Sequence, residues 1–269
     1  MTTERVESRD DPRLVANRNL PERTLRGENL FIAEGRLLVH RLLDSCFAAE
    51  SVFTEEKYRD EFEPRTKAAG IPLYLGSRSL LTETIGYQFH LGTLAVGKRP
   101  SRQESRAHDD FRHLLSHDAV RLIGCPDTNK RENLGMLFRC AAALGIDGLL
   151  LGTKGADPFS RRCLRTSMGS VLNLPFRQMP DFPGFLRELR NDHGFQVVAT
   201  VLEEPAELLW EVDWARKTIV LIGNEYSGLT QEVLRESDRK ATIPMHRRTD
   251  SLNLAVCAGI VIYEMTRPY

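Results

Sequence analysis

The sequence of 269 residues lacks paired cysteines, long apolar runs and an excess of charge of either sign. Its five cysteines are scattered and never form a C-x-x-C pair, so neither a disulfide framework nor a zinc ribbon is indicated. The longest nearly uninterrupted apolar run, Leu252 to Tyr263, is far shorter than the roughly 18 residues of a membrane-spanning helix. No signal peptide is evident at the start. We therefore expect a cytoplasmic protein with reduced thiols and no membrane partner.

Several common site motifs are absent as well. The sequence has no G-x-G-x-x-G or G-x-x-x-x-G-K loop and no G-x-S-x-G elbow. Dinucleotide-dependent oxidoreductases, nucleoside triphosphatases and hydrolases therefore lose their main support. His108, His113 and His117 are spaced like a metal cluster, but no carboxylate or cysteine is arranged to complete a site. We expect no metal.

Charge is balanced overall but uneven along the chain. The 37 basic and 37 acidic residues cancel, so composition alone gives no reason to expect a polyanionic partner. The stretch from Phe159 to Arg177 nevertheless carries four arginines and no acid. Such a cluster is usually a solvated surface, and it gains functional meaning only if a chemical site lies beside it.

A polar stretch from Val96 to Asp110 separates two regions in which strands and helices alternate. The first region implies a small α/β sandwich, and the short apolar strands of the second imply a mostly parallel sheet covered on both faces. We predict an α/β protein with domains at residues 1–97 and 118–269, joined by a linker and connecting helix at 98–117. In the second domain the expected strands are 119–125, 148–152, 196–202, 218–223 and 241–245.

Ligands bind at the carboxyl ends of parallel strands, so the loops that follow these strands are the places to look for chemistry. The first loop leads into a helix on which Gly135 and Arg139 lie one turn apart, away from the apolar face. A glycine at that distance lets a phosphate or another backbone come close while the guanidinium forks over it.

The second loop, at residues 221–230, carries a buried strand into Gly223 and Asn224 and restarts as a helix after Gly228. This pattern supplies backbone amides where a sheet ends.

The third loop reads "IPMHRRTDSLNLAV" and begins at Ile243. Pro244 ends a strand, and Asp250 or Ser251 is expected to cap a helix over residues 252–265 that is apolar nearly all round. A helix of this kind must be buried on every side, so we expect it to pack into the sheet and against a partner subunit. The segment "HRRTD" has no such structural explanation.

Taken in order, the three loops resemble the signature motifs of the SpoU (TrmH-like) branch of the SPOUT RNA methyltransferases. The first motif, N-x-G-x-x-x-R, is met at Asn133, Gly135 and Arg139. The second, G-N/A-E-x-x-G-L, is met at Gly223, Asn224, Glu225, Gly228 and Leu229, and the third, I-P-M followed by S-L-N, at Ile243, Pro244, Met245, Ser251, Leu252 and Asn253. Arg165, Ser167 and Gly169 are similar to the family's R-x-S-x-G-A stretch.

This resemblance implies a trefoil-knotted α/β domain that dimerises and binds S-adenosylmethionine in the knot. The implied reaction is methyl transfer to a ribose 2′-hydroxyl of RNA. Upstream, "NLFIAEGRLLVHRLLDS" is similar to the F-x-x-E-G-x-x-L-V opening of an L30e-like substrate-binding domain found in several rRNA enzymes of the family. Together they imply a two-domain, homodimeric enzyme, with ribosomal RNA favoured as the substrate.

The resemblance also assigns roles to single residues. The arginine matching Arg139 is the catalytic group of the family. It serves as a base only in an unusual environment and otherwise positions phosphate and stabilises charge, and both roles stay open here. We expect catalytic residues at Arg139, Asn133, Glu225, Ser251 and Asn253, and cofactor-binding residues at Thr200, Gly223, Asn224, Ile243, Met245 and Leu252. RNA-binding residues are expected at Arg165 and Arg247.

One position departs from the family pattern. Many members have a glycine two residues after the Met of I-P-M, where this chain has Arg247. We expect its side chain to point outward to RNA phosphate. Two alternatives to an rRNA enzyme also stay open: a tRNA 2′-O-methyltransferase, and a non-catalytic RNA-binding or ribosome-assembly protein that retains the fold.

Overall fold

The computed structural model describes residues 3–20, 25–100, 106–202, 205–224, 226–247 and 250–267, without the side chains of Arg26 and of residues 106–110. The chain divides into two compact units. The N-terminal unit consists of residues 1–105 and 159–173, and the C-terminal unit of residues 106–158 and 174–269. A short segment from the second half of the sequence thus belongs to the N-terminal unit.

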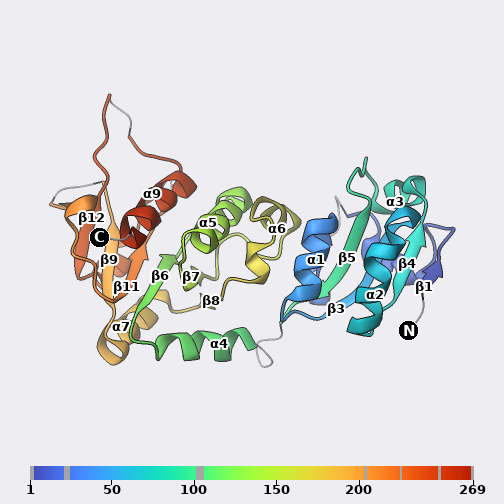
Figure 1. Ribbon diagram of the computed structural model, residues 1–269. Coiled ribbons are helices and arrows are strands. Elements are labelled where there is room, and N and C mark those ends of the chain that lie inside the picture. Colours follow the sequence, from blue (N-terminus) through green and yellow to red (C-terminus); the bar gives the residue numbers. More distant parts are fainter. Residues whose placement is uncertain are drawn as a thin grey trace. The chain divides into compact units, whose positions relative to one another are not determined.

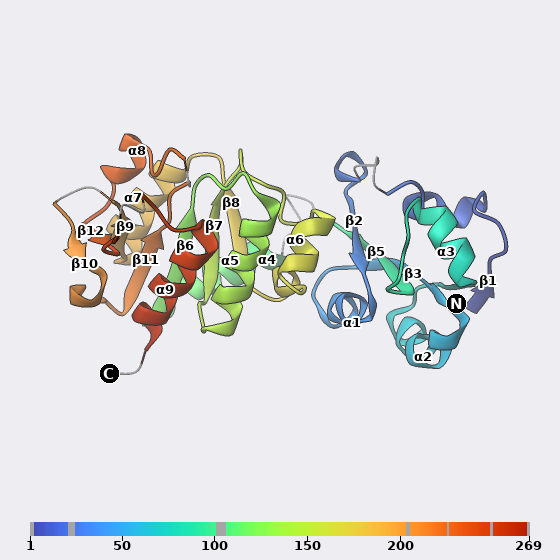
Figure 2. The same cartoon turned by 90° about the horizontal axis from the view of Figure 1, so that it is seen from above.

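The N-terminal unit is built on a five-stranded mixed sheet in the order β1-β4-β3-β5-β2 (Figure 1). β5 runs antiparallel to both of its neighbours, whereas β1, β4 and β3 run parallel to one another. Figure 2 shows α1 and α2 on one side of this sheet and α3 on the other. The strands are β1 Thr3–Arg5, β2 Leu30–Glu34, β3 Ala49–Glu55, β4 Leu73–Gly76 and β5 Thr93–Lys98. The helices are α1 Arg36–Asp44, α2 Arg59–Ala69, α3 Arg78–Ile85 and α6 Arg161–Thr166, with 3-10 helices η1 Pro12–Asn17, η2 Arg26–Glu28, η3 Glu56–Tyr58 and η4 Ser170–Leu172.

The C-terminal unit is built on a seven-stranded sheet in the order β10-β12-β9-β11-β6-β7-β8, and every pair in it is parallel. Helices α5 and α9 cover one face, and α4 and α7 cover the other (Figure 1). The strands are β6 Val120–Cys125, β7 Gly148–Gly152, β8 Phe176–Met179, β9 Gln196–Thr200, β10 Glu207–Leu208, β11 Lys217–Leu221 and β12 Arg239–Thr242. The helices are α4 Arg106–Leu115, α5 Arg131–Ala143, α7 Phe182–His193, α8 Gln231–Leu234 and α9 Leu254–Thr266, with the 3-10 helix η5 Leu209–Glu211.

The predicted α/β class and the predicted parallel sheet are both confirmed, and the five strands expected in the second domain are present. Strands β8 and β10 were not expected. Both lie at the edges of the sheet, where β8 is only partly buried along its whole length and β10 has two residues. Neither therefore leaves the apolar run in the sequence by which a buried strand is recognised.

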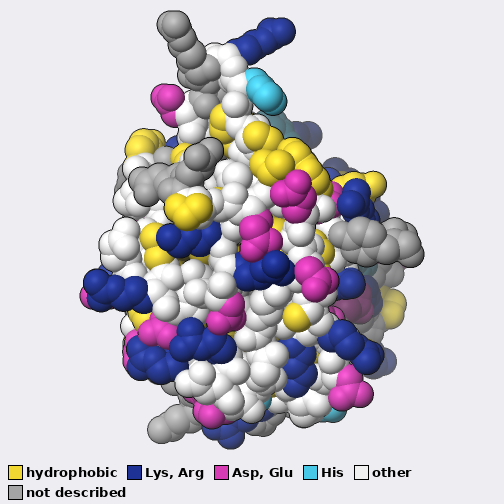
Figure 3. Space-filling model, turned by 90° about the vertical axis from the view of Figure 1, so that its left-hand side faces the viewer, with side chains coloured by type: hydrophobic (Ala, Val, Ile, Leu, Met, Phe, Trp, Pro, Cys, Tyr) yellow, Lys and Arg dark blue, Asp and Glu magenta, His cyan; other side chains and the backbone are white. Residues whose placement is uncertain are grey.

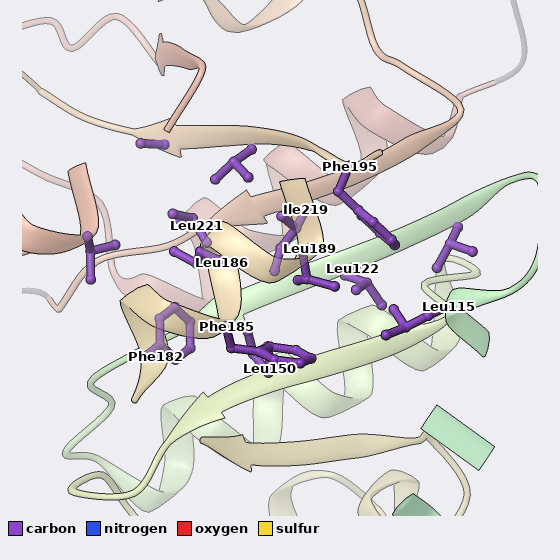
Figure 4. Close-up of a cluster of buried hydrophobic side chains, with 14 of the residues drawn as sticks. Leu115, Leu122, Leu150, Phe182, Phe185, Leu186, Leu189, Phe195, Ile219 and Leu221 are labelled. Atoms are coloured by element: carbon purple, nitrogen blue, oxygen red, sulfur yellow. The ribbon is translucent and has the colours of Figure 1, made fainter. Parts of the chain in front are cut away.

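One hydrophobic core cluster of the C-terminal unit lies between the sheet and the helices α4 and α7. Phe182, Phe185, Leu186 and Leu189 of α7 point at strand residues such as Leu221, as Figure 4 shows. Each fully buried side chain of this size contributes about 1.5–3 kcal/mol to folding. The cluster therefore fixes the four central strands against one another and holds their ends in place.

The register of the parallel strands brings four loops to one edge of the sheet. Leu221 of β11 pairs with Ala199 of β9 and with Gly124 of β6, and Ala241 of β12 pairs with Thr200. The loops that follow β6, β9, β11 and β12 therefore leave the sheet side by side. This is the edge at which open α/β sheets bind ligands.

Helix α9 begins at Leu254, two residues later than predicted. Asn253 is its N-cap, because the side-chain oxygen accepts a 2.9 Å hydrogen bond from the amide of Ala255. The prediction of Asp250 or Ser251 as the cap was wrong: both precede the residue at which the backbone turns helical. Among the described residues, no helix is long and apolar enough to cross a membrane.

Candidate functional site

A cavity of about 430 Å³ opens at the edge of the sheet where these loops meet. It is lined by the end of β9, the loop after β11, the start of the loop after β12, and the residues that lead into α9. The lining residues are Thr200, Val201, Leu202, Ile222, Gly223, Asn224, Tyr226, Ser227, Gly228, Leu229, Gln231, Leu234, Lys240, Ile243, Met245, Ser251, Leu252, Leu254 and Cys257. A volume of this size is typical of a site for a small molecule or cofactor.

The loop after β11 is a tight hairpin. The backbones of Asn224 and Gly228 exchange two hydrogen bonds of 3.1 and 2.9 Å, and Gly228 takes a left-handed conformation. A Cβ atom at Gly223 would lie 2.6 Å from the carbonyl carbon of Gly228, a contact with backbone that no side-chain rotation relieves. Glycine at position 223 thus allows the two arms of the hairpin to approach, and any other residue would open this wall of the cavity.

The loop after β6 is held by the neighbouring backbone. The carbonyl of buried Thr128 accepts a 2.6 Å hydrogen bond from the amide of Ala156, and its hydroxyl lies 2.5 Å from the Cys125 thiol. At Gly152 a Cβ atom would lie only 1.8 Å from the carbonyl oxygen of Pro126. The glycine at the end of β7 therefore leaves room for this loop to enter α5.

Asn133 and Asn253 join the first and third loops. The side-chain amide of Asn253 donates a 3.1 Å hydrogen bond to the side-chain oxygen of Asn133, while its own oxygen caps α9. Asn133 is buried in the first turn of α5. The pair therefore ties the N-terminus of α5 to the N-terminus of α9, next to Ser251 and Leu252 on the wall of the cavity.

The structure gathers most of the predicted site residues around this cavity. All six residues predicted to bind a cofactor line it, and so does Ser251. Asn133 and Asn253 lie beside it, joined to each other. Arg139 is exposed on α5, two turns beyond the start of that helix, and is not among the lining residues. Glu225 lies outside the described residues.

Arg247 stands in a backbone conformation that favours glycine. Its φ is +55°, and its side chain is exposed on the segment that projects between β12 and α9. Figure 3 shows this narrow projection, with charged side chains standing above a group of apolar ones. A residue with a Cβ atom in the left-handed region costs about 1–2 kcal/mol. Arg247 stands where the family has glycine, and its backbone keeps the left-handed conformation that a glycine adopts without strain.

Arg165 has a different environment, within the N-terminal unit. It is about half exposed and lies 3.9 Å from the carboxylate of Glu34, a residue that is 3% exposed. Arg161 forms a closer ion pair with Glu34 and donates a 2.7 Å hydrogen bond to the Tyr87 hydroxyl. Burial, together with the neighbouring Glu34, raises the pKa of Tyr87 to about 12. Arg161 and Arg165 of the acid-free stretch thus lie beside the carboxylate of Glu34, which belongs to strand β2 and is far away in the sequence.

Several residues of the cavity carry no motif that would reveal them in the sequence. Lys240 and Gln231 lie on strand β12 and helix α8, whose sequences carry no recognisable motif. Cys257 is a partly buried wall residue, and desolvation of its thiol raises its pKa to about 11. A thiol in that state is neutral and contributes shape to the cavity rather than a nucleophile.

The chemistry of the lining suits a molecule with one flat apolar part and one polar part. Aliphatic side chains from Ile222, Ile243 and Leu252 can sandwich a flat ring, while the backbone of the 223–229 hairpin can bond its edges. The hydroxyl of Ser251 can bond a polar head, whereas the Thr200 hydroxyl already donates a 2.8 Å hydrogen bond to the Leu221 carbonyl. Among the part of the chain that the structure describes, no group of three or more His, Cys, Asp or Glu residues is placed to hold a metal ion.

The sequence of this chain is similar to those of known RNA methyltransferases. A sequence profile of the SpoU rRNA Methylase family matches residues 121–263. An uncharacterised tRNA/rRNA methyltransferase of Mycobacterium tuberculosis is 36% identical over 267 residues, which cover 96% of this chain and 90% of the relative. The 23S rRNA (guanosine(2553)-2′-O)-methyltransferase RlmP of Bacillus subtilis is 28% identical over 237 residues, or 88% of each chain.

The fold is shared with solved structures over almost the whole chain. An rRNA methyltransferase from Sinorhizobium meliloti, crystallised with bound AdoMet, superposes with a TM-score of 0.84 at 27% identity. The match covers 98% of this chain and 97% of that one. Similarity therefore extends through both units and is not confined to the three loops.

Proposed function

We propose that this chain, which belongs to the SpoU rRNA Methylase family, methylates a ribose 2′-hydroxyl of ribosomal RNA. It is an RNA 2′-O-ribose methyltransferase that uses S-adenosylmethionine. Ribosomal RNA is the substrate we favour, because the RlmP relative and the AdoMet-bound structural neighbour are both named for rRNA. An enzyme with that substrate works in the cytoplasm, where ribosomes are assembled.

The observation that supports the proposal best is the convergence of the three loops on one cavity. Residues of the second and third motifs line it, and Asn133 of the first motif is hydrogen-bonded to Asn253 of the third. These residues are 120 positions apart in the sequence. A protein that kept only the fold would not need this arrangement of polar groups, which argues for catalysis over a purely binding role.

The cavity residues divide into holders of the cofactor and neighbours of the reacting atoms. Ile243, Met245 and Leu252 would hold the adenine between them, and Thr200, Gly223 and Asn224 would bond its polar edges. When bound, S-adenosylmethionine supplies an electrophilic methyl group. The buried placement of Asn224, 6% exposed, and the closed hairpin around it would fix the orientation of that group relative to the RNA.

The 2′-hydroxyl must lose its proton as it attacks, and both reactants must be held in line. Arg139 is exposed, and we propose that its guanidinium binds the substrate phosphate and stabilises the developing negative charge on the ribose oxygen. Ser251, Asn133 and Asn253, at the junction of the α5 and α9 termini, would orient the ribose. Glu225 follows Asn224 in the second motif, and we propose the same orienting role for it.

RNA binding would draw on both units. Residues 1–97 would form the L30e-like substrate-binding domain, and residues 118–269 the methyltransferase domain, with 98–117 between them. Arg247 would contact phosphate directly, because its exposed side chain stands on the projecting segment. Arg165 would contribute less, since Glu34 already lies 3.9 Å away.

A homodimer would explain the outer face of α9. Val256, Ile260 and Tyr263 are 51%, 40% and 61% exposed, and their spacing of four and three residues puts them on one face. Met136 of the neighbouring α5 is exposed as well. An apolar stripe of this kind is suited to a two-fold interface between copies of the chain. Replacement of Tyr263 by Asp is expected to yield monomers in sedimentation equilibrium, while the wild type sediments as a dimer.

The test of the proposed function has two steps. Calorimetry should show that the protein binds S-adenosylmethionine, and tritium transfer from the labelled cofactor should then be measured on unmodified 16S, 23S and transfer RNA. Ribose-methylation mapping of the labelled RNA would identify the nucleotide. Transfer to tRNA alone would replace the proposed substrate, and cofactor binding without transfer to any RNA would contradict catalysis.

A further inference from the structure

Tyr226 is the most exposed large apolar side chain among the described residues, at 82% exposure, and it stands at the rim of the cavity. It occupies the turn of the 223–229 hairpin, a position that the family motif leaves free. An isolated exposed tyrosine needs no explanation by itself. Its place beside a cofactor site does, because the RNA must approach the methyl group past this rim.

The backbone at Tyr226 is held in place by the hairpin. The amide of Tyr226 donates a 2.9 Å hydrogen bond to the side-chain oxygen of Asn224, and the backbone of Asn224 is itself paired with Gly228. Asn224 is buried on the cavity wall. The backbone that carries the exposed ring is therefore ordered before any ligand arrives, which lowers the entropy cost of a contact with it.

A cation from the first loop lies over the ring. The ammonium nitrogen of Lys130 is 5.3 Å from the ring centroid of Tyr226. Lys130 is the residue immediately before α5, three positions from Asn133. This contact joins the first and second loops on the side of the cavity where the ribose is expected, so an aromatic face and a positive charge are presented together.

We propose that Tyr226 stacks on the base of the nucleotide to be methylated, or of its immediate neighbour, while Lys130 binds an adjacent phosphate. The inference rests on the proposed function and deepens it. Sequence-specific RNA recognition mostly uses unpaired bases, which stack on aromatic side chains, and every base offers a π-face. A base stacked on a fixed ring at the rim would set the distance from its ribose to the methyl group.

The surroundings favour RNA over a protein partner. Ser227 and Gly228 follow Tyr226 in the hairpin, and the ammonium group of Lys130 lies over the ring from the first loop, so small residues and a positive charge stand beside the ring. A protein interface needs a contiguous apolar core, whereas a nucleotide combines a flat ring with a negative phosphate. The ring of Tyr226 would contact the base, and the ammonium group of Lys130 would contact the phosphate.

The experiment compares Tyr226→Ala and Tyr226→Leu with Tyr226→Phe, which keeps the ring. Steady-state methyl transfer is measured on whichever transcript the wild type modifies, and cofactor affinity is measured by calorimetry without RNA. The Ala and Leu variants should raise the KM for RNA about tenfold or more, while Phe stays within about twofold of the wild type. Cofactor affinity should be the same in all four proteins, and Lys130→Ala should weaken RNA binding and reduce its salt dependence.

A direct measurement of RNA binding tests the stacking role of Tyr226 independently of methyl transfer. Affinity for a fluorescein-labelled single-stranded RNA dodecamer is measured by anisotropy, with the same order of variants expected. A wild type that transfers no methyl but binds the dodecamer through Tyr226 contradicts the proposed function and leaves the stacking role standing. Stacking is overturned if Tyr226→Ala matches the wild type, if Phe fails as Ala does, if cofactor affinity falls in parallel with RNA affinity, or if Tyr226→Ala changes only the oligomeric state.

Discussion

The Glu34 cluster of the N-terminal unit and the cavity of the C-terminal unit use polar residues in opposite ways. In the N-terminal unit, which has a mixed sheet, the buried carboxylate of Glu34 is matched by Arg161 and approached by Arg165, so charge is neutralised within the fold. In the C-terminal unit the strands are all parallel, and their carboxyl ends deliver polar residues to a cavity that is open to solvent. Charges on this side, at Arg139 and Arg247, are exposed.

This difference predicts which mutations should change stability and which should change activity or binding. A polar group whose partner lies inside the fold contributes to stability, and its loss leaves an unpaired charge in a poorly solvated place. A polar group that faces an open site contributes to ligands that are not part of the chain, and its loss leaves the fold unchanged. Mutations of groups that are paired inside the fold should lower the melting temperature. Mutations of groups that face the cavity should change only the rate of methyl transfer or the affinity for a ligand.

The largest effect is expected for Arg139→Ala. Methyl transfer should fall by about 10²–10³-fold, because a positioned positive charge that stabilises the reacting oxygen is lost. Cofactor affinity and melting temperature should stay the same, since the side chain is exposed and lies off the cavity wall. Arg112→Ala on α4 is a matched control, another exposed helix arginine of the same unit. Activity within tenfold of the wild type would remove Arg139 from the mechanism.

Arg161→Ala should have the largest effect on stability. It leaves Glu34, whose side chain is 2% exposed, with Arg165 at 3.9 Å as the remaining ion-pair contact that the structure places there. The free energy of unfolding should drop by about 3–5 kcal/mol in urea titrations, as for other broken buried pairs. Lys67→Ala, an exposed change in the same unit, should stay within about 0.5 kcal/mol.

A second change tests whether charge is the cause of that loss. Adding Glu34→Gln to Arg161→Ala should recover part of the lost stability, because it removes a buried carboxylate that has lost its closest partner. A double variant that is less stable than Arg161→Ala alone would show that packing around residue 161, rather than charge, carries the effect.

Arg247→Gly separates backbone from side chain. Glycine suits the φ of +55°, so the loop and cofactor affinity should be preserved, and the small relief of strain should leave the melting temperature equal or slightly higher. Affinity for RNA should fall several-fold, and the slope of log K against log salt should shrink by about 1 if one phosphate contact is lost. Arg165→Ala should change that slope less, because Glu34 shares its guanidinium.

The smallest effect concerns thiol reactivity. Cys46 is exposed in the N-terminal unit, whereas Cys257 lines the cavity and burial raises its pKa to about 11. At pH 8 only about a thousandth of such a thiol is ionised, so iodoacetamide should label Cys46 much faster than Cys257 in peptide mass spectra. S-adenosylmethionine should slow the labelling of Cys257 further. Equal rates at the two thiols would mean that the cavity is more open than described.

The fold class and the position of the cavity followed from the sequence, because buried parallel strands leave apolar runs and their loops must meet at one edge. The residues around the cavity came from the three motifs. The cap of α9 did not follow, since Asp250, Ser251 and Asn253 are all good cap residues and the choice depends on where Asn133 accepts a bond. Pairing of Glu34 with Arg161 joins positions 127 apart, and periodicity carries no information about such contacts.

Helix α9 illustrates a further limit. An apolar helix was expected to be buried all round, but the sequence pattern alone does not separate the side that packs on α5 from the side that carries Val256 and Tyr263. The sequence gives no sign of a role for Tyr226 for a related reason. A single tyrosine in a turn is unremarkable in a sequence, and only its exposure beside the cavity gives it meaning.

Residues 159–173 lie in the second half of the sequence but pack with the N-terminal unit, and this limits how the two halves can be inherited. An exchange of residues 1–105 with the same region of a relative would leave Arg161 opposite whatever residue replaced Glu34. Recombination at the linker would therefore succeed only between chains that carry matching residues at both positions. In this protein residues 1–105 and 159–173 form one structural unit, which an exchange at the linker alone would divide.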